Sequence, residues 1–159
     1  LPWPCEIAAQ DMIHAVIFGS GRPTILVPPS ARAVALEHIA IAWDASRVAA
    51  RAHCDALPFL AEGRRVSVLA VRDEKPLRRS DPAGALASAL EKRGVDARSI
   101  DILLGGKNIA EALQDTALSE GANLLAMGGF GHSRIRDFIL GGATKGALRD
   151  LRLPTLLSH

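Results

Sequence analysis

The sequence predicts an α/β fold, a three-layer, doubly wound sheet of five parallel strands in the order 3-2-1-4-5. Three observations lead to this prediction. Beyond residue 37, short apolar runs typical of buried strands alternate with stretches of helical period, as in parallel sheets covered on both faces. The alternation repeats four times, which gives the crossovers of a doubly wound sheet. At 159 residues, 48% of them hydrophobic, the chain is long enough for one compact core.

The first two strand-helix units follow from apolar spacing and capping residues. The first strand is predicted at residues 38–43 and the first helix at 46–61, where apolar residues recur at helical spacing. A second buried strand is predicted at residues 66–71. Asp81 and Pro82 then supply a capping side chain and a proline at the first position of a second helix, which a glycine ends.

The second half of the domain continues the same pattern. Asn108 and Glu111 have the spacing of a capping box and start a third helix, which ends at Gly121. A glycine-rich loop then precedes a last helix and a short fifth strand. The remaining strands are predicted at residues 100–104, 124–127 and 155–157, and the last helix at residues 142–151.

The first thirty residues do not fit the start of such a fold. They predict a helix over residues 6–18, a Gly-Ser-Gly break and a strand. Residues 22–27, Arg-Pro-Thr-Ile-Leu-Val, resemble residues 153–158, Leu-Pro-Thr-Leu-Leu-Ser. We therefore predict that residues 1–30 are the helix-strand end of a preceding copy plus a linker, and that residues 37–159 are the domain itself. An N-terminal helical extension is the alternative.

These two similar strands lead to an expectation about pairing. Unpaired sheet edges invite association. We expect the strand at residues 24–27 to lie beside the strand at residues 155–158, within one chain or across a dimer.

The stretch with most bearing on function is the glycine-rich segment 128–144, between the fourth strand and the last helix. Glycines let backbone N–H groups approach an anion without a Cβ in the way, and a helix N-terminus adds partial positive charge. The segment therefore has the properties of a phosphate-binding loop. A tight strand-to-helix turn that needs glycine for its dihedral angles fits the same residues.

The glycine spacing resembles that of a known family. Gly128, Gly131 and Gly141 are similar to the signature G-x2-G-x9-G-[ST] of the universal stress protein family. Residues 43–46, Trp-Asp-Ala-Ser, resemble the Asp that follows the first strand in that family, and the closing Pro-Thr-Leu-Leu-Ser-His resembles the tail of members with two such domains in tandem. The resemblance covers nearly all of residues 37–159. It implies the Usp fold, which is like that of the adenine-nucleotide alpha-hydrolases, and the C-terminal domain of a tandem protein.

The resemblance also implies a ligand, an adenine nucleotide. ATP is the first expectation, with AMP, ADP and a magnesium counter-ion left open. Asp44 would contact the ribose or adenine end, and Val71 would meet adenine through its backbone. The implied contacts are Ala42, Asp44, Val71, Met127, Gly128, Gly131, His132, Gly141, Gly142, Ala143 and Thr144.

Two residues qualify this set. The signature has Ser or Thr where this chain has Gly142, so a hydroxyl donor to phosphate is absent while the backbone N–H remains. Asp44 has a second interpretation, because an Asp after a strand often caps the next helix, and Asp44 or Ser46 is placed to do so.

Composition argues against several other classes of function. The net charge is +2, from 19 Lys and Arg against 17 Asp and Glu, and aromatic residues make up 4% without any tyrosine, which argues against a nucleic-acid surface. No apolar run reaches the roughly 18–20 residues of a membrane span. Cys5 and Cys54 belong to no metal or redox motif, which fits the reducing cytoplasm.

We therefore predict a cytoplasmic stress-response module that binds an adenine nucleotide and associates through its last strand as a homodimer or within one chain. No catalytic residue and no metal site is assigned, since neither GxxxxGK[ST] nor HExxH occurs. Two alternatives stay open. One is a nucleotide-free dimerisation module, and the other is an enzyme such as a slow ATPase or a nucleotide-dependent transferase.

Overall fold

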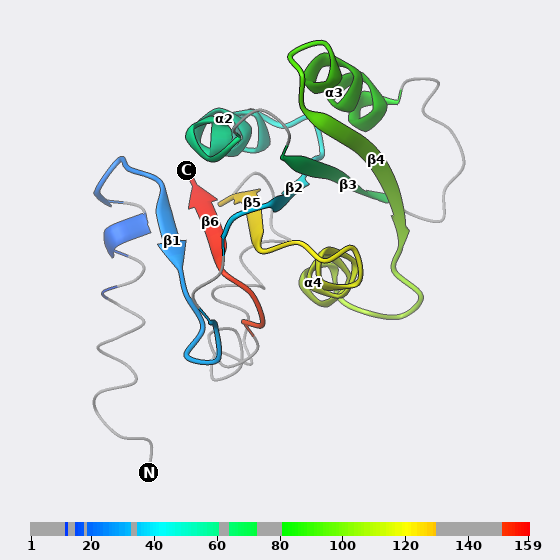
Figure 1. The fold of residues 1–159 in the computed structure, drawn as a ribbon. Coiled ribbons are helices and arrows are strands. Elements are labelled where there is room, and N and C mark those ends of the chain that lie inside the picture. The colour runs from blue at the N-terminus through cyan, green and yellow to red at the C-terminus, as the bar shows by residue number, and fades with distance from the viewer. Residues whose placement is uncertain are drawn as a thin grey trace.

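A computed structural model describes residues 12, 15–17, 19–32, 35–60, 64–72, 81–129 and 151–159. Its core is a six-stranded sheet in the order β1-β6-β5-β2-β3-β4 (Figure 1). The strands are β1 (Thr24–Leu26), β2 (His38–Ala42), β3 (Arg65–Arg72), β4 (Asp96–Leu103), β5 (Leu124–Gly128) and β6 (Thr155–Ser158). All neighbours from β2 to β6 pair in parallel. The predicted order 3-2-1-4-5 is confirmed for these five strands.

The helices begin where their capping residues predict. They are α2 (Arg47–Ala56), α3 (Pro82–Glu91) and α4 (Ile109–Ser119), with a short 3-10 turn, η1 (Leu57–Phe59), after α2. Asp81 caps α3, and Asn108 and Glu111 form the expected capping box of α4. Among the helices in the described part of the chain, none is long and apolar enough to cross a membrane.

Two predicted boundaries are wrong. The helix predicted over residues 46–61 ends at Ala56, because Pro58 lies in the tighter turn of η1, where its missing N–H is tolerated. The third predicted strand, which is β4 in the structure, begins at Asp96 rather than at residue 100. Among the described strands it is the last of the sheet and pairs with β3 alone. Three of its first four residues are exposed, so this part looks less apolar than a central strand.

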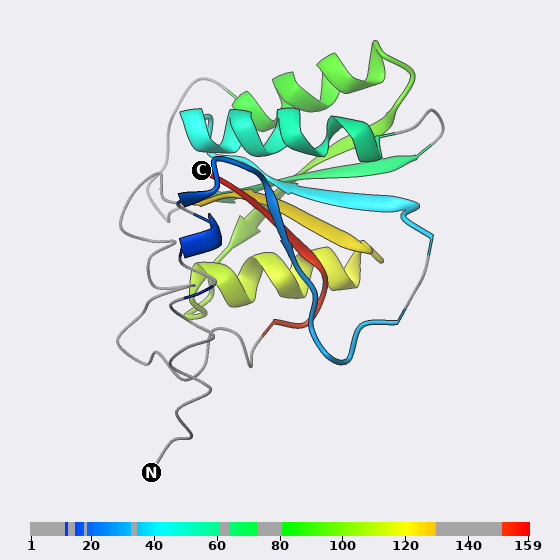
Figure 2. The same ribbon diagram turned by 90° about the vertical axis from the view of Figure 1, so that its left-hand side faces the viewer.

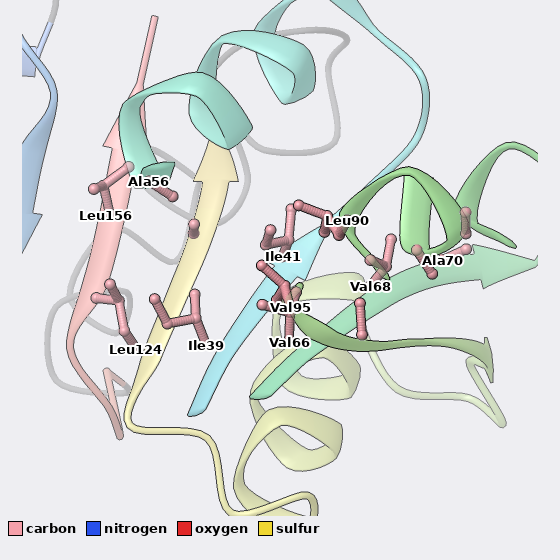
Figure 3. Close-up of a cluster of buried hydrophobic side chains, with 14 residues drawn as sticks. Ile39, Ile41, Ala56, Val66, Val68, Ala70, Leu90, Val95, Leu124 and Leu156 are labelled. Atoms are coloured by element: carbon pink, nitrogen blue, oxygen red, sulfur yellow. The ribbon is translucent and has the colours of Figure 1, made fainter. Parts of the chain in front are cut away.

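Alternate residues of the strands supply two cores, one on each face of the sheet. Ile39, Ile41 and Val68 face α2 and α3, where they pack with residues such as Ala56 and Leu90 (Figure 3). The next residues along the strands face α4; this second cluster includes Ala40, Leu69, Leu125, Met127, Leu113 and Ala117. Figure 2 shows α2 and α3 on one side of the sheet and α4 on the other. This is the three-layer architecture expected from the sequence.

β1 adds a sixth strand at the edge of the sheet, antiparallel to β6. The register pairs Thr24 with Leu157 and Leu26 with Thr155. The expected association of the two similar strands is therefore confirmed, and it occurs within the chain. The division into residues 1–30 and 37–159 stays a prediction. Most of the helix predicted over 6–18, and all of that predicted over 142–151 except Leu151, lie outside the described residues.

Candidate functional site

A crevice of about 140 Å³ opens at the carboxyl ends of β2, β3 and β5. β2 has β3 on one side and β5 on the other, so the chain order reverses at this point, where open α/β sheets bind ligands. Three strand ends, the loop after β2 and the first turns of α2 and α4 form its walls. The lining residues are Ala42, Trp43, Asp44, Ser46, Val48, Ala49, Leu69, Val71, Ile109, Leu113, Met127 and Gly128.

The loop after β2 forms the polar edge of the crevice. Asp44 Oδ1 accepts a hydrogen bond from Ser46 N at 2.9 Å, which closes an Asx turn around Ala45. Ala45 has φ 60°, a left-handed conformation that costs energy for a residue with a Cβ. Ser46 is the residue that caps α2, because its Oγ accepts from Ala49 N at 3.2 Å. Asp44 is exposed, and its Oδ2 has no donor among the described residues.

The start of α2 presses directly against the end of β5 at Gly128. A Cβ at this position would lie 2.6 Å from the carbonyl carbon of Val48 and 2.8 Å from Ala49 N. These are backbone atoms, which have no rotamer to escape a clash. Glycine at position 128 is therefore required for the helix to approach the strand, and this contact sets the width of the crevice between α2 and β5.

The interior of the crevice is apolar. Leu69 and Met127 form its floor and are almost fully buried, while Val71 is partly exposed. Ile109 and Leu113, one helical turn apart on α4, form the wall on the other face of the sheet. The walls therefore offer apolar contacts, and the loop at Asp44 offers hydrogen-bonding groups.

Residues 35–159 match the Universal stress protein family. The chain belongs to this family. No curated protein matches the sequence at a significant level.

Solved structures of similar fold include further universal stress proteins. One, from Archaeoglobus fulgidus, has a TM-score of 0.64 and 16% identity, and the match covers 86% of this chain and 49% of that one. The hypothetical protein MJ0577, whose biochemical function was assigned from its structure, has a TM-score of 0.56 and 19% identity over 79% of this chain and 96% of its own. A universal stress protein in complex with cAMP has a TM-score of 0.53 and 19% identity over 79% of this chain and 99% of its own. At these identities the comparisons establish the α/β fold.

The universal stress protein resemblance named eleven ligand contacts, and the structure brings five of them together. All five line the crevice: Ala42, Asp44, Val71, Met127 and Gly128. They come from three strands and one loop that are far apart in the sequence. The other six lie outside the described residues: Gly131, His132, Gly141, Gly142, Ala143 and Thr144.

Sequence reasoning did not assign the remaining lining residues to the site. Leu69 carries the signal of a buried strand and nothing more, since only the pairing of β3 with β2 places it under the crevice. Ile109 and Leu113 belong to the helix predicted after Asn108, although a helical pattern does not show which end of a helix meets a ligand. Ser46 was considered as a cap, and the structure shows that its helix points into the crevice.

Trp43 lies in the same loop and packs against α2. Its ring meets His53 edge-on, with ring centres 6.3 Å apart and an interplanar angle of 81°. Trp43 Nε1 and His53 Nε2 are buried and have no hydrogen-bond partner in the described part of the protein. Burial, and then the positive charge of Arg93, lower the pKa of His53. Trp43 therefore gives the crevice a fluorescent reporter.

A second hollow, of about 220 Å³, lies at the opposite ends of the strands, where β2, β3 and β4 begin. It is lined by His38, Arg65, Val66, Asp96 and Arg98. His38 is buried, its Nε2 lies 2.9 Å from Ser67 Oγ, and its Nδ1 has no partner among the described residues. Burial lowers the pKa of His38, and Arg65 and Arg98 lower it further against the opposing effect of Asp96.

Proposed function

We propose that the crevice binds an adenine nucleotide, ATP first, and that the protein is a cytoplasmic stress-response module regulated by this ligand. One observation carries the proposal. The five described residues that the family resemblance implies as nucleotide contacts line a single crevice, at the point where the strand order of the sheet reverses. The relative that was crystallised with cAMP gives further support, since an adenine nucleotide occupies that member of the family.

The chemistry of the crevice fits the base and sugar of a nucleotide. Leu69, Met127 and Leu113 offer apolar contacts to a purine ring. The Oδ2 atom of Asp44 is free to accept from a ribose hydroxyl, because the Asx turn occupies only Oδ1. In this proposal Val71 meets the base edge through its backbone.

The phosphates would extend along the glycine-rich segment that follows Gly128. The contacts expected there are those of Gly131, His132, Gly141, Gly142, Ala143 and Thr144. Glycine at position 142 removes the hydroxyl that Ser or Thr would offer, so ATP should gain less from its phosphates than in a member that keeps the signature. ADP and AMP are therefore tested beside ATP, each with and without Mg²⁺.

Thermal unfolding with added nucleotide tests the proposal. A ligand at about a hundred times its Kd stabilises a fold by about 2.7 kcal/mol, which is easily seen as a rise in Tm. We expect a rise with ATP, a larger one in Gly142→Ser, and release of an adenine nucleotide on mass spectrometry of the purified protein. If ATP, ADP and AMP all leave Tm unchanged at millimolar concentration and no nucleotide copurifies, the nucleotide-free dimerisation module replaces this proposal. Release of phosphate from bound ATP would instead favour the slow ATPase.

A second proposal concerns assembly, and the antiparallel pair of β1 and β6 favours it. We infer that residues up to 27 are the end of a preceding copy of the domain, whose last strand pairs with β6. Similarity of residues 22–27 to 153–158 supports this, as does the Archaeoglobus fulgidus chain, of which the match covers only 49%.

Size-exclusion chromatography with light scattering tests the assembly. With β1 in place the β6 edge is already paired, so the chain should run as a monomer. Removal of residues 1–30 exposes the β6 edge, and the shortened protein should form a homodimer through it. A shortened protein that stays folded and monomeric would argue against association through the last strand.

A further inference from the structure

The N-terminal segment, residues 15–17 and 19–26, packs through Ile17 into the core between the sheet and α4. Ile17 is only 2% exposed and belongs to the same buried cluster as Met127 and Leu157. Its neighbour Val16 is 42% exposed. Ile17 is therefore the inward-facing residue of this part of the segment, and Figure 2 shows residues 15–17 beside the ends of β5 and β6.

Ile17 lies next to the point where the chain leaves the crevice. A Cβ on Gly129 would come 3.9 Å from Ile17 Cγ2 and 3.5 Å from the carbonyl oxygen of Ser158, both ordinary contact distances. The Gly129 N–H also donates to that carbonyl at 2.6 Å. Gly129, one residue after the crevice residue Gly128, is thus bonded to the end of β6, and Ile17 borders the space beside it.

The same segment also contacts α2, at a residue outside the lining of the crevice. Arg51 Nη2, on α2, donates to the carbonyl oxygen of Gly21 at 3.3 Å. α2 is the helix whose first turn lines the crevice and packs on Gly128. The segment thus pairs with β6, bonds to α2 and lies close to Gly129, the residue after β5. Of these elements, α2 and β5 line the crevice.

We propose that Ile17, Gly21 and β1 form part of the frame of the ligand crevice and that Ile17 is a positioning residue for it. When the segment is seated, Ile17 and Ser158 fix Gly129, and thereby the end of β5 against α2. β1 has three residues and a partly exposed outer side, so its seating is one of the weaker interactions of the fold. Nucleotide affinity therefore depends on whether β1 is paired, and bound nucleotide strengthens that pairing by the same factor. This inference rests on the proposed nucleotide binding.

Fluorescence titration measures the first half of this coupling. Trp3→Phe leaves Trp43, in the crevice, as the single tryptophan. In that background we expect Ile17→Ala to raise the Kd for ATP about tenfold, within the 5- to 150-fold range typical of coupled sites. Ile17→Val, which keeps a branched apolar side chain, should restore most of the affinity. Val16→Ala is the matched control at an exposed neighbour and should leave the Kd unchanged.

Hydrogen exchange measures the reciprocal half and does not depend on a substitution. Saturating ATP should slow exchange of the amides at residues 24–26 by a factor similar to the loss of affinity in Ile17→Ala. A Kd that is equal in the wild type and Ile17→Ala, or exchange in β1 that ATP does not alter, overturns the inference while leaving nucleotide binding intact. Failure of the wild type to bind ATP, ADP or AMP overturns the proposed function, and this inference with it.

Discussion

Two hollows open at opposite ends of the strands of one sheet, and the side chains that line them differ in chemistry. The crevice at the carboxyl ends of β2, β3 and β5 is mainly apolar, and it meets the start of α2 and an Asx turn with a free carboxylate oxygen. The hollow at the amino ends of β2, β3 and β4 is lined by charged side chains around buried His38.

The charged side chains of the second hollow act on buried His38, and one of them also pairs with a residue outside the hollow. Arg98 forms an ion pair with Glu120, just beyond α4, and both Arg65 and Arg98 act on His38. The comparison assigns the proposed ligand binding to the carboxyl ends of the strands and the titration of buried His38 to their amino ends. Each of the following predictions tests that separation.

The largest effect is expected at Gly128. Gly128→Val places a side chain against the backbone of Val48 and Ala49, so it should lower the free energy of unfolding by about 3 kcal/mol, the upper end of overpacking costs. Urea unfolding measures this. Gly129→Ala is the control, because its Cβ meets only ordinary contacts and should cost less than about 1 kcal/mol. Equal losses at both positions would show that α2 does not press on β5 at Gly128.

At the amino ends of the strands, we predict that the free energy of unfolding depends on pH through His38. The pKa of buried His38 lies below the unfolded value of about 6.5, so the unfolded state takes up the proton first. The stabilising contribution is present above about pH 6.5 and is lost as the pH falls through the native pKa. Urea unfolding at about pH 7.5 and about pH 5.5 should show this loss.

His38→Gln is the variant that locates the effect. It should flatten the fall in stability below about pH 6.5, although His53, whose pKa is also lowered, leaves part of the slope. The Kd for ATP at a fixed pH should be the same as in the wild type. A changed Kd would contradict the separation of the two ends.

Asp44 should show the opposite behaviour at the carboxyl ends of the strands. Asp44→Ala removes the carboxylate proposed to meet the ribose, so the affinity for ATP should fall about tenfold, which corresponds to about 1.4 kcal/mol. Isothermal titration calorimetry measures this. Asp44→Asn keeps an oxygen for the Asx turn and serves to separate loss of charge from loss of the turn. Unaltered affinity in both variants would remove Asp44 from the site.

The smallest effect is expected at Ala45. Its left-handed φ of 60° suits glycine better than alanine. Ala45→Gly should therefore stabilise the fold by about 0.5 kcal/mol, because relief of about 1–2 kcal/mol of strain is offset by the greater freedom of glycine in the unfolded chain. Thermal unfolding measures it, and a destabilised variant would show that the turn is not strained.

The sequence by itself predicted features that depend on neighbouring residues. Asp81 caps α3, and Asn108 and Glu111 cap α4, because capping is a contact between residues three apart. The alternation of strands and helices was enough for the order of β2 to β6, since right-handed crossovers leave few topologies open. The pairing of β1 with β6 followed from two similar strands.

Only the tertiary structure decided how residues distant in sequence meet. It brings Asp44, Val71 and Met127 to one crevice. It also shows why position 128 must be glycine, since the backbone of α2 lies where a Cβ would be, which the glycine signature alone did not show. It also places Ile17 beside Gly129. Hydrophobic burial is non-directional, so a sequence pattern shows that a residue is buried, whereas the packing of whole elements determines its neighbours.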